Sequence, residues 1–352
     1  MEEKNQIYLV ASECITSLGN SASVSTAAFK AGISLFAETA FLNKKLNPIK
    51  MALVPDEALP KLKDEDKFRC IPSRQQRLIK LISAAMSRIA DKLPPKESMP
   101  LFLALPEFLP GRSMPMVGNF IELLASQSEV PLEIATSKTA EIGRTGGIYA
   151  IEQAFNFLIE SGKDYALIGG VDSYFDPLLL SKLDADGRLH ALGVEDGFLP
   201  GEGACILLLA SSRIQKSLPK PWVKLYKPGF ALESDHFYSD QTNTSEALDQ
   251  AVKSALKNAS LEKIQALWTT MTFESFGQKE LGIALTRNSN NIKKDLRVNH
   301  PTDCFGDLGA ASSPVIMMLI AEGANKEAVD RHHLICSSSD QAHRAAIRID
   351  IE

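Results

Sequence analysis

The chain has 352 residues, of which 45% are hydrophobic and 23% are charged, so it can bury one large core or two smaller ones. The formal net charge of −5 and the scattered lysines and arginines form no basic stripe, so we expect no nucleic-acid partner. The first residues are acidic and only briefly apolar, so we expect neither a signal peptide nor a membrane span. The five cysteines are widely spaced, and a reducing cytoplasm is the expected compartment.

Apolar runs bounded by turn residues alternate with helical periodicity along the whole chain. In the first 215 residues we expect strands at 7–11, 101–105, 132–136, 165–168 and 205–209, and helices at 23–31, 74–93, 117–126 and 143–161. The segment 211–228 is rich in Ser, Pro and Lys, which is typical of a connector. Beyond it we expect helices at 245–259, 278–286 and 309–321, and strands at 265–271, 334–337 and 345–351. This alternation predicts an α/β fold with a mixed or parallel sheet covered on both faces.

The most specific motif lies between two of these strands, in residues 169–209. A Gly-Gly-x-Asp strand end at 169–172 is followed by an Asp-Gly-Phe-x-x-Gly-Glu-Gly-Ala turn at 196–204. This pattern resembles that of the β-ketoacyl-ACP synthases, the condensing enzymes of the thiolase superfamily. The first strand with its Thr-x-Leu-Gly turn and the Leu-Gly-Ala-Ala stretch at 308–311 are similar to further segments of that family.

The resemblance implies a thiolase fold, in which two pseudo-repeated α/β halves form a five-layered αβαβα sandwich. The halves are expected at residues 1–215 and 216–352, although no direct sequence repeat is visible. Members of the family form dimers through the strand and helix that neighbour the nucleophile, here 132–136 and 137–151. We therefore expect this chain to pair with a second copy or with a related protein.

The residues that condense acyl groups in the family are missing from their expected positions. The nucleophilic cysteine falls at Arg144, and no cysteine lies between Cys70 and Cys205. A guanidinium stays protonated at any useful pH and cannot carry an acyl group. The two assisting histidines fall at Thr269 and Gly306. These replacements predict a chain without condensing activity of its own.

Two further positions depart from the family pattern. The lysine that precedes the second histidine corresponds to Pro301, and the glycine-rich turn near the C-terminus corresponds to residues 337–343, which contain no glycine. In the family those glycines let backbone amides approach the substrate oxyanion. The loss of this turn is consistent with a centre that no longer turns over substrate.

Arg144 has two interpretations from sequence. It fills the vacated pocket and pairs with a carboxylate such as Glu141, Glu274 or Glu280, or it binds an external anion such as a phosphopantetheine phosphate or a carboxylate of a partner. We favour the structural interpretation, because a buried arginine needs a partner in either case.

A relocated reaction centre is the alternative to an inactive one. Cys304 and His300 lie close together in the sequence, beside Asp303 and Asp307, which suggests an alternative nucleophile and base. The spacing of these four residues fits no established zinc pattern, so we expect neither a metal nor a cofactor. The remaining histidines near the C-terminus, His332, His333 and His343, are predicted to lie at the surface.

The leading hypothesis is a catalytically inactive synthase-like protein that acts as an interaction, scaffold or adaptor protein. It is similar to the non-catalytic synthase-like proteins found with type VI secretion effectors, so a secretion effector is one expected partner. The first alternative is a chain-length-factor-like subunit that pairs with an active ketosynthase in fatty acid, polyketide or aryl polyene synthesis, with an acyl carrier protein as a further partner. The second alternative is an active acyltransferase that uses Cys304.

Overall fold

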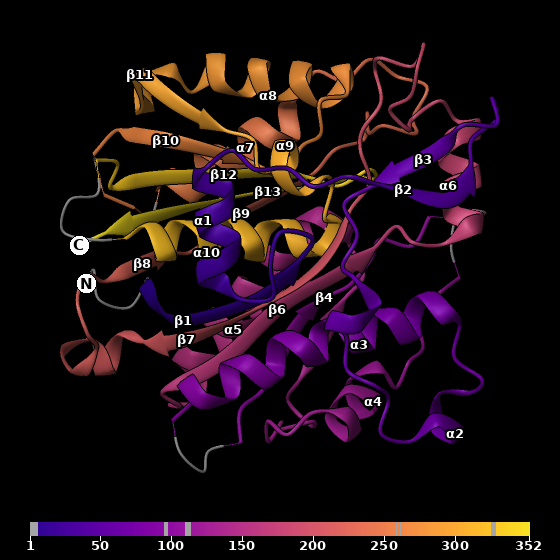
Figure 1. Cartoon of the computed structure of the whole chain (residues 1–352). Coiled ribbons are helices and arrows are strands. Elements are labelled where there is room, and N and C mark those ends of the chain that lie inside the picture. The colour runs from indigo at the N-terminus through magenta and orange to yellow at the C-terminus, as the bar shows by residue number, and fades with distance from the viewer. Residues whose placement is uncertain (1–5, 95–97, 110–113, 258, 261, 325–328) are drawn as a thin grey trace.

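The computed structural model describes residues 6–352 except 95–97, 110–113, 258, 261 and 325–328. Layers of helices and strands alternate from one side of the molecule to the other, with helices outside, helices in the middle and strands between them (Figure 1). The mixed α/β class and the five layers predicted from the sequence are therefore confirmed.

Most of the N-terminal part of the chain forms the middle and lower layers of Figure 1. Its strands are β1 (Gln6–Thr16), β2 (Ala37–Leu42), β3 (Pro48–Met51), β4 (Leu101–Ala104), β5 (Lys138–Ala140), β6 (Tyr165–Ser173) and β7 (Glu202–Ser211). Its helices are α1 (Ala22–Lys30), α2 (Glu65–Phe68), α3 (Ser73–Ile89), α4 (Phe120–Gln127), α5 (Gly146–Glu160) and α6 (Pro177–Ala185), with short 3-10 turns η2 (Asp56–Ala58), η3 (Ala90–Lys92) and η4 (Gly143–Thr145).

The C-terminal part contains the upper layers. Its strands are β8 (Val223–Tyr226), β9 (Gly229–Leu232), β10 (Ile264–Thr269), β11 (Ile292–Asn299), β12 (His332–Ser338) and β13 (His343–Ile351). Its helices are α7 (Glu246–Lys257), α8 (Ser275–Arg287), α9 (Thr302–Phe305) and α10 (Ser312–Gly323), with the 3-10 turns η5 (Ser212–Ser217), η6 (Ser289–Asn291) and η7 (Gly309–Ala311).

One large sheet runs through both parts in the order β11-β10-β12-β13-β8-β1-β7-β6-β4-β5, with β9 also paired to β13. At each end three parallel strands are followed by antiparallel ones: β5, β4 and β6 lead to β7 and β1, and β11, β10 and β12 lead to β13 with β8 and β9. The two halves thus repeat one strand pattern that the sequence does not reveal. Their division at residue 215 stays a prediction, because β8 pairs with both β1 and β13.

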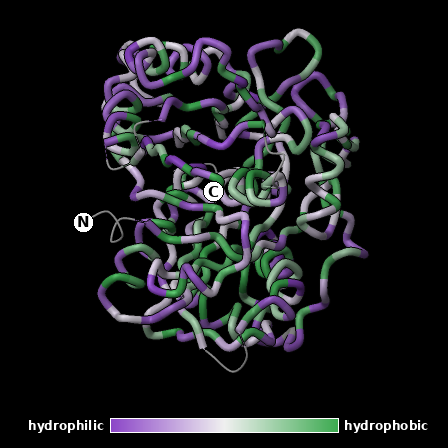
Figure 2. The backbone as a smooth tube through the Cα atoms, turned by 90° about the vertical axis from the view of Figure 1, so that its left-hand side faces the viewer, coloured by the Kyte–Doolittle hydropathy of each residue, from purple (hydrophilic) through white to green (hydrophobic). Residues whose placement is uncertain are grey.

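Burial explains the helical layers. The outer helix α3 places Leu78, Ile82 and Met86 on one face, against the sheet, and leaves its other face polar, as an amphipathic helix does. The central helix α10 is apolar on all sides, because it lies between β-layers above and below it. Figure 2 shows hydrophobic segments concentrated in the lower layers and more hydrophilic segments in the upper ones.

Two sequence expectations about local structure were wrong. Residues 132–136 form a turn rather than a strand, since the amides of Thr136 and Ser137 both bond to the carbonyl of Glu133, and the edge strand β5 begins at Lys138. The segment 211–228 is not a free connector. Its first part forms η5 and its end forms β8, which is inserted into the sheet.

Candidate functional site

Arg144 lies in η4, directly before the long helix α5, and is only 6% exposed. The hydroxyl of Ser313 in α10 donates to the Arg144 carbonyl at 2.7 Å. The close approach of the two helices requires Gly147, because a Cβ there would lie 2.4 Å from a ring carbon of Pro314. The start of α5 is therefore fixed against the start of α10.

The guanidinium of Arg144 is held by two aspartates from distant loops. Its Nε lies 3.1 Å from both carboxylate oxygens of Asp307, its Nη2 also donates to Asp307, and its Nη1 donates to Asp340 at 2.6 Å. The Tyr174 hydroxyl donates to the same Asp307 carboxylate at 2.6 Å. Glu141, Glu274 and Glu280, which were expected as candidate partners of Arg144, do not pair with it. The structural interpretation, in which Arg144 pairs with a buried carboxylate, agrees with its contacts to Asp307 and Asp340.

A second arginine continues this arrangement. Arg188 donates to Asp340 at 2.6 Å and forms a two-point ion pair with Glu274 at 2.8 Å. Its guanidinium also lies 4.0 Å from the ring centroid of Phe237, a favourable cation–π geometry. Asp307, Arg144, Asp340, Arg188 and Glu274 thus form a continuous buried series of alternating charges, called here the charge chain.

Burial and pairing shape the acidities of this chain. Burial alone would lower the pKa of Arg144, but Asp307 and Asp340 raise it well above its ordinary value. Burial would raise the pKa of Asp340, whereas the two arginines hold it well below the usual range. Burial and the negative charge of Asp307 raise the pKa of Tyr174, so its hydroxyl remains a donor. Arg144, Arg188 and Asp340 are thus stabilised in their ionised forms by their neighbours.

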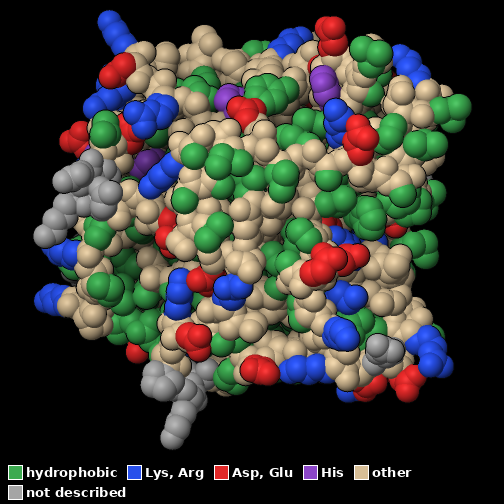
Figure 3. All heavy atoms as spheres, in the orientation of Figure 1, with side chains coloured by type: hydrophobic (Ala, Val, Ile, Leu, Met, Phe, Trp, Pro, Cys, Tyr) green, Lys and Arg blue, Asp and Glu red, His purple; other side chains and the backbone are tan. Residues whose placement is uncertain are grey.

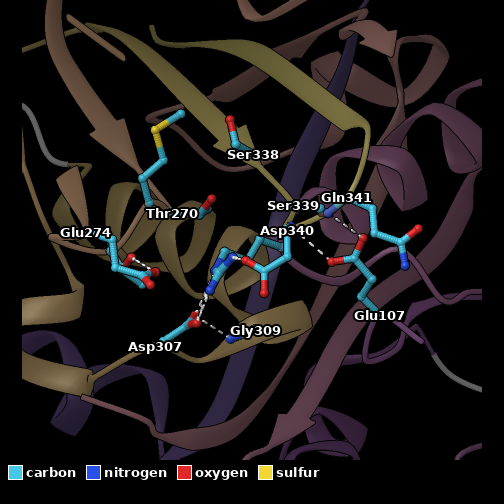
Figure 4. A network of polar contacts seen from close by, with 12 residues as sticks. Glu107, Thr270, Glu274, Asp307, Gly309, Ser338, Ser339, Asp340 and Gln341 are labelled. Atoms are coloured by element: carbon cyan, nitrogen blue, oxygen red, sulfur yellow. Dashed lines mark hydrogen bonds and ion pairs between the residues drawn. The ribbon is translucent and has the colours of Figure 1, made fainter. Parts of the chain in front are cut away.

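Glu107 binds the turn that carries Asp340. Its two carboxylate oxygens accept the backbone amides of Asp340 and Gln341 at 3.0 and 3.1 Å, as Figure 4 shows. Burial, together with the nearby charge of Asp340, raises the pKa of Glu107 to about 8. These contacts hold the glycine-free turn at 337–343 through a side chain.

Gly306 and Thr269, where the two assisting histidines were expected, serve packing. Gly306 has φ 66°, and a Cβ there would lie 2.8 Å from the Leu199 carbonyl, so the loop after α9 needs glycine. Thr269 ends β10, is fully buried, and accepts the amide of Met271 at 3.0 Å. Figure 4 places the next residue, Thr270, near the same centre as Asp307 and Asp340. The structure therefore brings the Arg144, Thr269 and Gly306 segments together around one centre.

The acidic residues of the Gly-rich motif hold loops through ion pairs and backbone amides. Asp172 accepts Arg74 and the amide of Ala310, each at 3.0 Å. Glu202 forms a two-point pair with Arg77, at 2.6 Å for each bond. Within the described residues, the cavity beside Arg144 measures about 30 Å³. That space holds about one or two water molecules and no acyl chain.

Cys304 and His300 do not form an activated pair. Cys304 is 6% exposed in the short helix α9, and burial, followed by the charge of Asp303, raises the pKa of its thiol. Burial lowers the pKa of His300, whose ring packs on Phe273, and no hydrogen bond joins it to Cys304 among the described contacts. A nucleophile would need the opposite shift of its thiol pKa.

Across the described ranges, no group of three or more His, Cys, Asp and Glu residues is arranged to hold a metal ion. In the same part of the chain, every helix is too short or too polar to cross a bilayer. The surface prediction was wrong for His333, which is 6% exposed, while His332 and His343 are half-buried.

Sequence reasoning named three members of the charge chain, Arg144, Asp307 and Glu274, but missed how they are paired. It placed Arg144 but not Asp307 and Asp340 as its partners, and it did not consider Arg188 or Tyr174. A usable signal was present, because Asp307 and Asp340 stand in the two stretches that align with the family's second histidine and its glycine turn. An arginine at the nucleophile position needs a carboxylate from the loops around it.

Comparison with known proteins rests on structures, since no protein-family model and no curated protein matches the chain. The ishigamide ketosynthase/chain length factor superposes with a TM-score of 0.76 at 17% identity, covering 99% of both chains. The ketosynthase in complex with its chain length factor from Xenorhabdus doucetiae gives 0.71 at 13% identity, covering 99% of this chain and 98% of the other. A type II polyketide ketosynthase structure with its acyl-carrier protein gives 0.72 at 14%, covering 98% and 99%. The chain therefore has the thiolase fold of ketosynthases and chain length factors.

Proposed function

We propose that this chain is a non-condensing, chain-length-factor-like subunit that pairs with an active ketosynthase through the sheet edge at β5. The observation that carries the proposal is Arg144, which stands where the acyl-carrying cysteine is expected and is held by Asp307 and Asp340. A guanidinium forms no thioester, and these two carboxylates already satisfy its charge.

The closed centre also argues against a substrate site within this chain. The cavity at Arg144 is far smaller than the 300–1,000 Å³ typical of ligand pockets. An acyl chain would have to displace members of the charge chain and leave buried charges without partners, which costs several kcal/mol. The function of this region is therefore to keep the subunit rigid behind its interface.

The β5 edge offers the surface for pairing. Among the described residues, β5 is the last strand of the sheet and pairs with β4 alone, and Lys138 and Thr139 are exposed. The Ala140 carbonyl points inward, since it accepts the amide of Leu105. Because successive residues of a strand point their backbone groups to opposite sides, the amide and carbonyl of Thr139 point outward. Exposed Ile134 and Tyr149 supply apolar area in the neighbouring turn and helix.

The comparisons support the class of partner. Two of the similar structures are described as a ketosynthase with a chain length factor, and a third contains an acyl-carrier protein with its ketosynthase. In the proposed complex the ketosynthase supplies the nucleophile and receives the acyl carrier protein. This chain supplies the second face of the dimer.

An adaptor in type VI secretion is the second candidate. It is supported by the same closed centre, and it differs in its partner, which would be a secretion effector or a second copy of this chain. The identity and stoichiometry of the partner separate the two functions.

The test is affinity capture of the tagged chain from its native cells, followed by mass spectrometry and measurement of the complex mass. We expect a one-to-one complex with a ketosynthase that retains its cysteine and histidines. Intact-mass analysis after incubation with an acyl thioester should place the acyl group on that partner only. Capture of a secretion effector, or of a second copy alone, would contradict the proposal, as would an acyl adduct on this chain.

A further inference from the structure

A second cavity, unrelated to Arg144, opens between α1, α10 and the strands β10 and β11. It measures about 450 Å³, within the range of small-molecule sites. Leu319 and Ile320 from the end of α10 line its apolar side. The Arg144 centre contacts Ser313 at the other end of the same helix. At 1.5 Å per residue, the span from Ser313 to Gly323 separates the two regions by about 15 Å.

Aromatic rings form one wall of this cavity. Phe29 and Trp268 lie with their ring centroids 5.8 Å apart and their planes tilted by 35°. Phe305 stacks behind Phe29 at 6.0 Å. Trp268 is 8% exposed, so only a small part of its indole ring is open to solvent. In Figure 3, hydrophobic side chains gather in the middle of the face where Figure 1 shows α1 and α9.

The polar atoms of this wall are satisfied inside the protein. The Trp268 Nε1–H donates to Nδ1 of His333 at 3.2 Å, and Nε2 of His333 lies 3.1 Å from the Asp330 carbonyl. These contacts require the neutral tautomer with its proton on Nε2. Burial lowers the pKa of His333 to about 4, so the ring is neutral near pH 7. The aromatic wall therefore presents ring surfaces, and the buried hydroxyl of Thr26, which has no hydrogen-bond partner among the described residues, is a further polar group of the lining.

The rim of the cavity is positive. Lys30, the last residue of α1, is exposed and forms no ion pair within the described residues. Arg297 of β11 pairs with Asp330 at 3.1 Å, so these two charges compensate each other. The unpaired Lys30 ammonium leaves one net positive charge beside an apolar, aromatic interior. This combination is complementary to a molecule with an apolar body and a single negative charge.

We propose that this cavity binds a small apolar monoanion, with its apolar part against Trp268 and Phe29 and its anionic group at Lys30. A linear carboxylate and an aromatic carboxylate share this chemistry, and decanoate and 2-naphthoate distinguish the two sources. The site is independent of the proposed pairing at β5 and requires no reaction at Arg144.

The test uses tryptophan fluorescence, since the chain contains only two tryptophans. In Trp222→Phe the remaining signal reports on Trp268. We expect decanoate or 2-naphthoate to cause a saturable change in this signal, whereas the uncharged decan-1-ol binds more weakly. Lys30→Gln in the same background should weaken decanoate binding about fivefold, as expected for one partly exposed ion pair, without changing decan-1-ol binding.

Two matched variants complete the experiment. Lys216→Gln removes an exposed lysine of η5 outside the cavity and should leave decanoate binding unchanged. Ala266→Leu adds volume at the buried cavity wall and should reduce binding of every probe. Since Ala266→Leu could impair folding, Lys30→Gln, on the surface, decides the question alone. The absence of saturable binding by either carboxylate, or equal affinities in Lys30→Gln and Lys216→Gln, would overturn the proposal.

Discussion

The two edge strands of the sheet, β11 and β5, are protected to different extents against pairing with a strand of another chain. β11 is eight residues long and exposes Lys293, Lys294 and Arg297, and charged side chains of this kind discourage pairing with another strand. β5 is three residues long, and Lys138 is its single charged residue. Arg144 and the charge chain begin four residues beyond the end of β5. Under the proposed pairing, the N-terminal end takes the partner at β5, whereas the charged residues of β11 protect the C-terminal end against one.

The largest expected effect comes from removing the Arg144 guanidinium, whose ion pairs hold the loops that follow β5. Arg144→Met leaves Asp307 and Asp340 buried without their shared cation, which should lower the free energy of unfolding by about 3–5 kcal/mol. Urea denaturation measures this change. Arg213→Met is the control, because Arg213 and Asp164 are both largely exposed at 3.4 Å and their pairing is worth less than about 1 kcal/mol. Equal losses in both variants would contradict the role assigned to the charge chain.

The pH dependence of the unfolding free energy tests the contact between Glu107 and the turn that carries Asp340. Its folded pKa, about 8, lies above the ordinary value of 4.5, so the folded protein binds the extra proton and loses stability as pH rises from about 4.5 to 8. Glu107→Gln imitates the protonated form and should remove this loss, on the order of 1 kcal/mol for each pKa unit of the shift. Unfolding free energies of both proteins from pH 5 to 9 should diverge with rising pH. Parallel curves would disprove the raised pKa.

A matched pair of lysines distinguishes the two edges directly. Lys138→Glu on β5 should shift the dissociation constant of the partner by about twofold to fivefold, because a charge at an interface rim contributes modestly. Lys294→Glu on β11 should leave it unchanged. Isothermal titration of the captured partner measures both. If Lys294→Glu alone changed the dissociation constant, the interface would lie at β11, at the opposite end of the sheet.

The smallest expected effect concerns Cys304. Cys70 is exposed, whereas Cys14, Cys205, Cys304 and Cys336 are buried. Iodoacetamide should therefore label Cys70 first, and Cys70→Ala should remove the rapid phase seen by mass spectrometry. If Cys304 were labelled as fast as Cys70, the result would support the hypothesis of an acyltransferase that uses Cys304.

The fold could be predicted from the sequence because glycines and acidic residues of the motif at 169–204 serve packing. Asp172 and Glu202 hold loops, and Gly170 lies so close to Ala310 that a Cβ would be 2.2 Å from its carbonyl oxygen. Such packing requirements do not depend on which residues stand at the positions of the family's catalytic groups. The position of Arg144 could be predicted for the same reason.

Local sequence pattern does not reveal the partners of Arg144, since Asp307 and Asp340 lie 163 and 196 residues further along the chain, and only the alignment of their two stretches with the family pattern points to them. Their approach depends on how three loops pack, which leaves no local pattern. β8 was missed because four strand residues follow a stretch rich in Pro, Ser and Lys. His333 was misplaced because its burial comes from packing beside Trp268.

The central claim, pairing through β5, is tested most directly by Thr139→Pro. The Thr139 amide points away from β4, so proline removes an outward donor without breaking an internal bond. The measurement is the mass of the purified complex with its partner, in Thr139→Pro and in the Lys294→Glu control. We predict a one-to-one complex with a ketosynthase that persists in the control and weakens at least tenfold in Thr139→Pro, while the unfolding free energy stays unchanged. An intact complex in Thr139→Pro would contradict the account.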